Sequence, residues 1–250
     1  MDSYRPEPGI GAPRAEKVSA AIARAIVQDI VERDLPAGTM LPAESIMLDR
    51  YRVGRASLRE GLRILEIQGL ITIKPGPGGG PVVAASSSTD FGRMSTLHYM
   101  GARAKFRELV EARRVIEPMM VGLAAETRDP EIIAQLRQLS AQTRKGIQDE
   151  FTYRWKTADF HRIIAGASGN RVLDLFGQSL LDIYAERVSG ALFPLEHREQ
   201  VQSDHDAITK AIEAGDVRKA QRLMRAHMDE VVQHVTERYP GLLDEVVDWR

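Results

Sequence analysis

The β-type residues of this 250-residue chain are concentrated in one short stretch, LITIKPGPGGGPVVAA, at residues 70–85. Two apolar runs flank a connection rich in Pro and Gly, a pattern that predicts a β-hairpin. The turn sequence KPGPGGG suggests a phosphate-binding loop as an alternative, but it lacks the Lys-Ser or Lys-Thr ending and the following helix of such loops. Elsewhere only helical periodicity appears. The expected fold class is therefore mainly α, with one small hairpin.

Helices are predicted on both sides of this hairpin. Before it, a helix over 15–33 has an apolar residue at every fourth position, and helices over 43–51 and 55–68 follow, separated by the turn residues RVG. After it, candidate helices of an all-α bundle lie at about 105–127, 130–148, 151–166, 171–189, 197–214 and 216–238.

Shifts in composition divide the chain into four expected segments. These are a flexible arm at 1–15, a compact N-terminal domain at 16–85, a linker at 86–100 and an all-helical domain at 101–240. The linker is predicted from the small polar residues of SSSTDFGRMS.

Composition limits the classes of function. The net charge is -1, so any site for a polyanion must be a local patch. The chain has no cysteine, which excludes disulfides, thiolate metal sites and cysteine nucleophiles. No apolar run approaches the roughly 20 residues that cross a bilayer, and the N-terminus lacks the apolar core of a signal peptide. We therefore expect a cytoplasmic protein with no membrane partner.

The segment RASLREGLRIL, at residues 55–65, places an arginine row beside a leucine face. At about 100° per residue, the row contains Arg55, Arg59 and Arg63, and the adjoining face contains Leu58, Leu62 and Leu65. Charges on a helix often indicate only a solvated surface. A local cationic strip can also contact phosphates and guanine edges in a major groove.

The order of elements favours DNA binding over a merely solvated surface. A helix, a turn, an arginine-bearing helix and a Gly-rich hairpin follow one another as in a winged helix-turn-helix, whose second helix enters the major groove. One such unit makes few base contacts, so we expect a homodimer on palindromic double-stranded operator DNA.

The run LPAESIMLDRYRVGRASLREGLRILEIQGLITIKPGPGGGPVV resembles the winged helix-turn-helix of the GntR family of transcriptional regulators. The resemblance implies DNA contacts from Arg55 and Arg59 and a wing glycine at Gly76. Gly54 stands where the family usually has Ser or Thr, so a phosphate contact or a helix cap is expected to be missing. The candidate DNA-contacting residues are Arg52, Arg55, Ser57, Arg59, Arg63, Lys74 and Gly76.

Three histidines of the helical half, His161, His205 and His227, lie in three different predicted helices. Imidazoles from three helices can converge inside a bundle to hold a divalent metal such as zinc. A histidine in a helix is more often a surface or hydrogen-bonded residue, so spacing alone leaves both interpretations open.

The segments EARRVIEPMMVGLAAE and DFHRIIAGASGN, with the stretch from His205 to His227, resemble the FCD effector domain of the FadR subfamily of GntR regulators. The resemblance implies a bundle cavity for a small ligand, commonly a carboxylate. Many members place an Asp four residues before the first His as a fourth metal ligand. Thr157 stands there in this chain, and threonine is a poor ligand for zinc. Two alternatives stay open: a three-histidine metal site completed by water or effector, and a metal-free cavity.

Arg113 matches an arginine that points into the cavity in this family, where its guanidinium would clamp a carboxylate. The alternative is a salt bridge to Glu117, one helical turn away. Asn170 is expected to cap a helix. Trp155 and Tyr184 could line a cavity, but ordinary core or interface aromatics are the more common case. The candidate effector-binding residues are Arg113, Thr157, His161, His205 and His227.

The expected function is a ligand-responsive DNA-binding transcriptional regulator. The resemblance implies that it is a repressor, released from its operator by a small carboxylate. We do not expect an enzyme. One alternative is a metal-dependent hydrolase with a DNA-binding appendage, which needs a general base near a metal-bound water. Another is an architectural DNA-binding protein whose bundle has no cavity.

Overall fold

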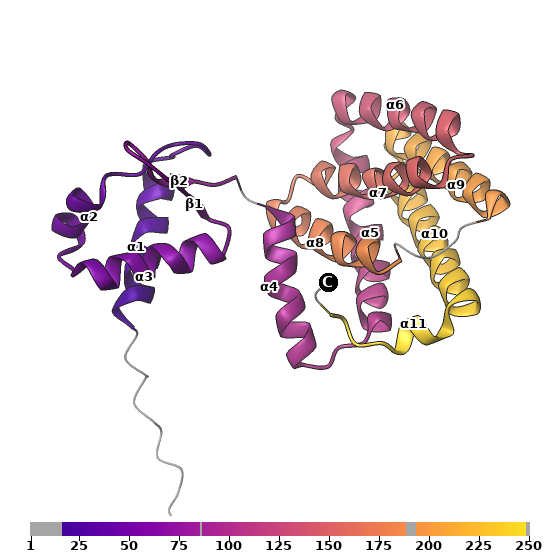
Figure 1. Ribbon diagram of the computed structural model, residues 1–250. Coiled ribbons are helices and arrows are strands. Elements are labelled where there is room, and N and C mark those ends of the chain that lie inside the picture. Colours follow the sequence, from indigo (N-terminus) through magenta and orange to yellow (C-terminus); the bar gives the residue numbers. More distant parts are fainter. Residues whose placement is uncertain (1–16, 86, 189–193, 249–250) are drawn as a thin grey trace, which may run out of the picture. The chain divides into compact units, whose positions relative to one another are not determined.

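The computed structural model describes residues 17–85, 87–188 and 194–248 (Figure 1). The chain divides into two compact units, Met1–Ser86 and Ser87–Arg250. The arm expected at 1–15 lies outside the described residues. Among the described helices, none is both long and apolar enough to cross a membrane.

The N-terminal unit is a helix-turn-helix followed by a hairpin. It contains α1 (Val18–Glu32), α2 (Glu44–Tyr51), α3 (Arg55–Ile67), β1 (Ile71–Lys74) and β2 (Gly80–Val83). The strands pair antiparallel, so the Pro/Gly-rich connection is a hairpin turn and not a phosphate-binding loop. A Cβ on Gly79 would lie 2.2 Å from the carbonyl oxygen of Lys74, so the turn requires glycine there.

The core of this unit forms where the leucine face of α3 meets α1. Leu58, Leu62 and Leu65 are buried, as their spacing predicts, and they pack with Ile22 and Ile26. Burial removes these apolar side chains from water, which is the main force that fixes α3 on α1.

Two polar contacts add to this core by joining α2 to α1. Tyr51 donates a hydrogen bond of 2.6 Å to Asp29, and Arg50 forms an ion pair with the same carboxylate. Burial and the bond to Asp29 raise the pKa of Tyr51 to about 12. These contacts hold the first helix of the helix-turn-helix in place and leave α3 free to present its other face.

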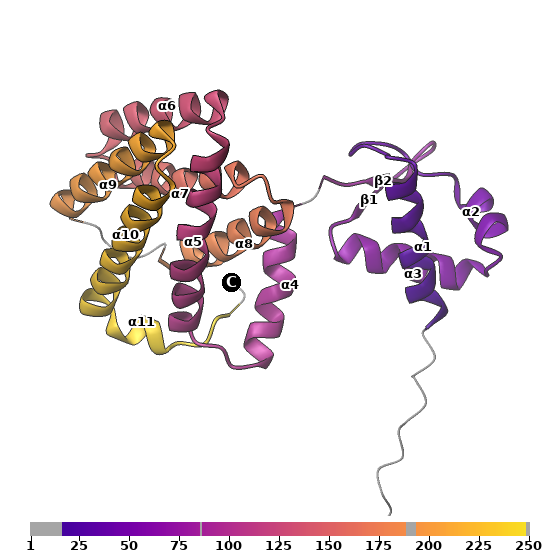
Figure 2. The same ribbon diagram turned by 180° about the vertical axis from the view of Figure 1, so that it is seen from behind.

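The C-terminal unit is an all-helical bundle. Its described helices are α4 (Ser88–Gly101), α5 (Phe106–Thr127), α6 (Pro130–Gly146), α7 (Glu150–Ala167), α8 (Arg171–Arg187), α9 (Leu195–Ala214), α10 (Val217–Arg238) and α11 (Pro240–Asp244). Figures 1 and 2 show α5 and α10 side by side, α6 beside α7 and α9, and α4 against α8. Asn170 caps α8 by accepting hydrogen bonds from two backbone N–H groups, as predicted.

The linker expected at 86–100 is wrong, because α4 occupies Ser88–Gly101. The inward-facing residues of α4 include Gly92 and Thr96, which are small rather than apolar, so no apolar periodicity marks the helix. The helical unit also continues past residue 240 through α11. Backbone hydrogen bonds join Phe106 to Glu245 and Val247 to Ala104, so the end of the described chain is part of the bundle.

Candidate DNA-binding face and effector pocket

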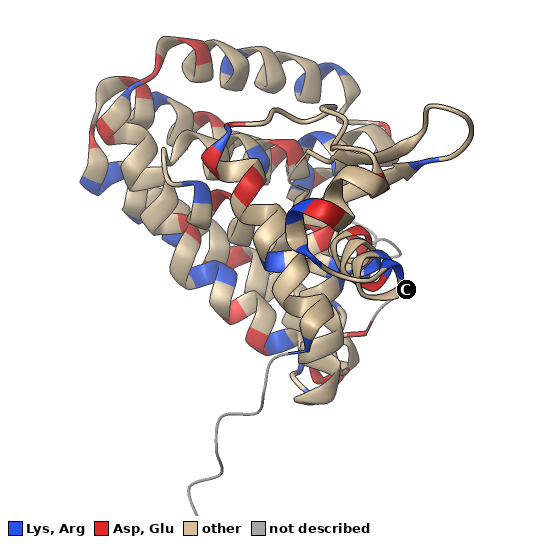
Figure 3. Cartoon of the chain, turned by 90° about the vertical axis from the view of Figure 1, so that its left-hand side faces the viewer, with Lys and Arg blue, Asp and Glu red and all other residues tan. Residues whose placement is uncertain are grey.

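The arginine row of α3 is exposed on the N-terminal unit. Arg55, Arg59 and Arg63 all face solvent, on the side of α3 next to the buried leucines. Figure 3 shows a basic position on the hairpin of this unit, and both basic and acidic positions on the helices of the unit and of the bundle. The arginine row of α3 therefore forms a local cationic strip, although the net charge of the whole chain is -1.

The other DNA-contacting candidates lie at the turn and the wing. Arg52 ends α2 in the left-handed conformation, with φ 51°, and is exposed. Ser57 is half-buried on α3. Lys74 ends β1, and Gly76 follows in the turn with φ 95°; both are exposed.

Sequence spacing did not reveal that Arg59 already has a partner. Its Nε lies 3.2 Å from Oε1 and 3.3 Å from Oε2 of Glu44, the first residue of α2. The side chain of Arg59 is 70% exposed, so this ion pair contributes little to stability. A phosphate or a base edge can therefore replace Glu44 at small cost.

The start of α3 lacks a side-chain cap, as the glycine at position 54 predicts. Gly54 is the N-cap residue and makes no side-chain hydrogen bond. The first N–H groups of α3 therefore have no side-chain acceptor at this position, and they are donors that could face a phosphate.

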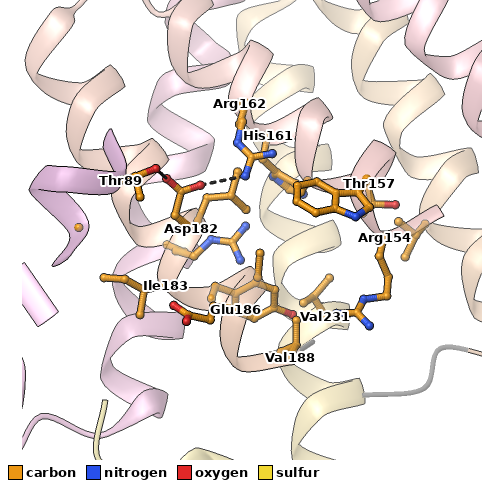
Figure 4. Close-up of a pocket in the computed structure, with 18 of the residues that line it drawn as sticks. Thr89, Arg154, Thr157, His161, Arg162, Asp182, Ile183, Glu186, Val188 and Val231 are labelled. Carbon is orange, nitrogen blue, oxygen red and sulfur yellow. Dashed lines mark hydrogen bonds and ion pairs between the residues drawn. The ribbon is translucent and has the colours of Figure 1, made fainter. Parts of the chain in front are cut away.

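The bundle contains a cavity of about 730 Å³ (Figure 4). Its wall is built by residues from α4, α5, α7, α8, α9 and α10. Four candidate effector-binding residues line it: Arg113, Thr157, His161 and His227. The alternative of an architectural protein predicted no cavity, and this finding contradicts it.

The three histidines converge, although they lie far apart in the sequence. His161, His205 and His227 are buried, and their candidate ligand nitrogens lie within 4.8 Å of one another. The Nε2 atoms of His205 and His227 are 3.3 Å apart. Two zinc–nitrogen bonds of about 2.0–2.1 Å at a tetrahedral angle separate the nitrogens by roughly 3.3 Å. The residues present thus fit a divalent metal.

Two carboxylates orient these imidazoles. Glu117 of α5 contacts Nδ1 of His161, and Asp204 of α9 lies 3.4 Å from Nδ1 of His227. A carboxylate on Nδ1 leaves Nε2 available for the centre of the cluster, as at many histidine metal sites. Sequence spacing missed both roles, because 44 residues separate Glu117 from His161 and 23 separate Asp204 from His227.

The electrostatics favour neutral imidazoles at His161 and His205 beside an ionised Glu117. Burial raises the pKa of Glu117, but the charge of Arg113 and the hydrogen bonds from Arg113 and His161 outweigh burial and hold this pKa at about 2. Burial lowers the pKa of His161 despite Glu117, and burial with the neighbouring His227 places the pKa of His205 well below its ordinary value. Neutral imidazole is the form that binds metals.

Arg113 forms the salt bridge that was the alternative to an effector role. Its Nε donates to Oε1 of Glu117 at 2.8 Å, and Nη2 lies 2.5 Å from the same oxygen. Its Nη1 is buried without a hydrogen-bond partner, and the residue lines the cavity. One nitrogen of the guanidinium thus remains for a ligand.

Of the two alternatives for Trp155 and Tyr184, the structure shows the less expected one, because both line the cavity. The ring of Tyr184 lies 4.3 Å below the Arg113 guanidinium and stacks on Phe106. Trp155 is 55% exposed on α7. The Thr157 hydroxyl is buried on the same helix and makes no hydrogen bond of ordinary length.

Comparison with known proteins agrees with both halves of this description. Residues 18–79 match the bacterial regulatory proteins of the gntR family, and residues 108–230 match the FCD domain. The chain belongs to the GntR family of regulators that carry an FCD domain. Together the two domains fit a ligand-responsive, DNA-binding transcriptional regulator.

Individual relatives extend along most of the chain. The chain is 30% identical over 223 residues to the HTH-type transcriptional repressor NanR of Edwardsiella tarda (strain FL6-60), covering 86% of this chain and 84% of that protein. It is 29% identical to NanR of Escherichia coli (strain K12), with 86% and 83% covered. A solved structure of Streptococcus agalactiae GntR superposes with a TM-score of 0.71 at 21% identity, covering 86% of this chain and 99% of that one, which shows the shared fold.

Proposed function

We propose that this protein is a repressor that binds a palindromic operator as a homodimer and is released by a small carboxylate. The proposal rests on one combination: an exposed arginine row on α3 and, in the bundle, a cavity of about 730 Å³ with an unpaired guanidinium nitrogen. The repressor relatives named above support the direction of the response.

On the DNA side, α3 is the element that enters the major groove. Arg55, Arg59 and Arg63 supply guanidinium groups that can bind guanine edges or phosphates, and Lys74 supplies a phosphate contact from the wing. When DNA binds, Arg59 leaves its exposed ion pair with Glu44 and contacts the DNA instead.

On the effector side, Arg113 is the anion clamp, and His161 and His227 line the pocket with His205 packed against them. Nη1 of Arg113 donates to one carboxylate oxygen, while Nε and Nη2 stay on Glu117. His161, His205 and His227 would hold a divalent metal such as zinc. When bound, the metal would offer an open position to an oxygen ligand, because Thr157 supplies no strong fourth ligand.

The DNA-binding half is tested on a fragment selected by the wild-type protein from a random duplex pool. Arg59→Ala should weaken binding of this fragment by about 1–3 kcal/mol and relax the sequence preference if Arg59 reads a base. An equal loss on random duplex would make Arg59 a phosphate contact. If the wild-type protein selects no sequence from the pool, the proposal is refuted.

The effector half is tested by a thermal-shift screen of carboxylates and acyl conjugates, with and without added zinc. A hit should release the selected fragment in fluorescence anisotropy. His205→Ala should abolish metal content in elemental analysis, whereas unchanged stoichiometry would discard the three-histidine site. A metal-dependent rate on ester or phosphoester substrates would instead support the hydrolase alternative.

A further inference from the structure

The first helix after the DNA-binding unit is also a wall of the effector pocket. Only residues 84–87 separate β2 from α4. The α4 residues Thr89, Gly92, Arg93 and Thr96 line the cavity. Whatever fixes the start of α4 therefore also fixes the point at which the N-terminal unit is attached to the bundle.

Asp182 of α8 accepts hydrogen bonds at that point. Its Oδ2 accepts hydrogen bonds from the hydroxyls of Ser88, at 3.0 Å, and Thr89, at 3.4 Å. Its Oδ1 accepts a bond of 2.8 Å from Nη2 of Arg162 on α7. Figure 4 shows Thr89, Asp182 and Arg162 in one row along the pocket. We call this set of four residues, Ser88, Thr89, Asp182 and Arg162, the Asp182 latch.

The latch is exposed to the contents of the pocket. Thr89, Asp182 and Arg162 all belong to the cavity wall, and the side chains of Asp182 and Arg162 are only 21% and 28% exposed. Hydrogen bonds to charged groups in such partly buried positions are stronger than those between neutral groups. A ligand oxygen that accepts from Arg162, or a ligand hydroxyl that donates to Asp182, competes directly with the bonds that hold α4.

We propose that Asp182 is a positioning residue through which the pocket controls the first turn of α4. In the ligand-free protein, the latch holds this turn against α8. An effector that takes over the hydrogen bonds of Arg162 or Asp182 releases Ser88 and Thr89. The point at which the DNA-binding unit joins the bundle is then no longer held against α8. This inference rests on the proposed function, because it supplies the differential contact that any coupling between two sites requires.

Asp159 gives a matched control for a purely structural ion pair. Its carboxylate lies 3.2 Å from Nη1 of the same Arg162, but it accepts no bond from α4 and does not line the cavity. If Asp182 served only to neutralise Arg162, substitutions of Asp182 and Asp159 would have similar consequences.

The latch is tested first by hydrogen exchange of the ligand-free, full-length protein. Asp182→Asn and the double variant Ser88→Ala/Thr89→Val should each accelerate amide exchange in the first turn of α4 by roughly tenfold, the factor that corresponds to one charge-assisted hydrogen bond. Asp159→Asn should leave this exchange unchanged. The double variant removes the α4 side of the latch without altering Arg162, so it remains informative if Asp182→Asn folds poorly.

Operator binding then shows whether the latch affects DNA binding or only the local structure of α4. On the fragment selected by the wild-type protein, both latch variants should bind about fivefold or more weakly without any ligand, within the range of typical coupling energies. Faster exchange with unchanged operator affinity would overturn the proposal, as would exchange equal to wild type. Either result leaves the proposed function intact, whereas a wild-type protein that selects no operator refutes that function and not the latch.

Discussion

At the level of single residues, Arg113 makes two kinds of contact with one guanidinium group. Nε and Nη2 neutralise the buried Glu117, while Nη1 is left without a partner at the cavity. The sequence allowed an effector clamp or a salt bridge, since the i to i+4 spacing fits both. The geometry shows the salt bridge and leaves one nitrogen available for the proposed effector.

The substitution Arg113→Lys separates these two contacts. A lysine keeps a positive charge for Glu117 but lacks the planar fork that serves Glu117 and a ligand together. We expect operator binding to persist and the response to a screened carboxylate to be lost. Arg113→Ala should also destabilise the bundle, by about 3–5 kcal/mol, because it leaves the buried charge of Glu117 without its arginine partner. A lysine variant with a normal ligand response, measured by anisotropy, would refute the clamp.

Protonation of buried histidines should make the metal-free protein less stable in acid. His197 of α9 stacks on His234 of α10, with ring centroids 3.9 Å apart. Burial first, and His234 second, lower the pKa of His197 from 6.5 to about 4. Between pH 6.5 and 4 the unfolded chain therefore binds more protons than the folded one, so stability is present above this window and is lost as pH falls.

Urea denaturation of the chelator-treated protein at several pH values measures this loss. His197→Gln should flatten the profile between pH 6.5 and 4, while His161 and His205, whose pKa values are also lowered, preserve part of the slope. The exposed His98 of α4 provides the control, and His98→Gln should leave the profile unchanged. Identical profiles for wild type and His197→Gln would contradict the prediction.

At the level of elements, sequence periodicity predicted the long helices with an apolar inward face and missed α4 and the short α11. The helices from α5 to α10 begin and end within a few residues of their expected bounds, since Pro130, Asn170 and Gly215 mark their limits. It missed α4, whose inward face has Gly92 and Thr96, and the five-residue α11.

The same limit explains the site. The three histidines and the family resemblance indicated the cluster. Glu117, Asp204 and Asp182, however, contact residues in other helices. Their contacts depend on how α5, α8 and α9 pack, and no local spacing encodes that packing.

The N-terminus of α3 offers a prediction about a single element. Gly54 has an extended conformation, with φ -78° and ψ 158°, and a Cβ there would meet nothing within 4 Å. Gly54→Ser should therefore stabilise the N-terminal unit by about 0.5–1 kcal/mol, through a side-chain cap and a less flexible unfolded chain. Urea denaturation followed by circular dichroism measures the effect, and Gly54→Ala, which has no hydroxyl, isolates the contribution of the cap.

At the level of the whole molecule, the proposed response requires that the pocket bind the effector differently when the protein is on DNA and off it. By linkage, a ligand that weakens operator binding by some factor is itself bound more weakly by that factor in the operator complex. If an oxygen of the effector fills the open metal position at the three-histidine site, the metal contributes to this difference in effector affinity.

Filling that position from the protein should therefore uncouple the two halves. Thr157 lies one turn before His161 on α7, so an aspartate there reaches the same side of the helix. Thr157→Asp should tighten zinc binding, measured with zinc alone by chelator competition, by about tenfold or more, equivalent to 1.4 kcal/mol. Operator binding should persist, but carboxylates should no longer release the protein. The control is Thr157→Asn, because asparagine has the shape of aspartate but no charge. It should leave the zinc affinity near wild type. If Thr157→Asp also leaves the zinc affinity unchanged, position 157 lies outside coordination reach and the prediction is contradicted.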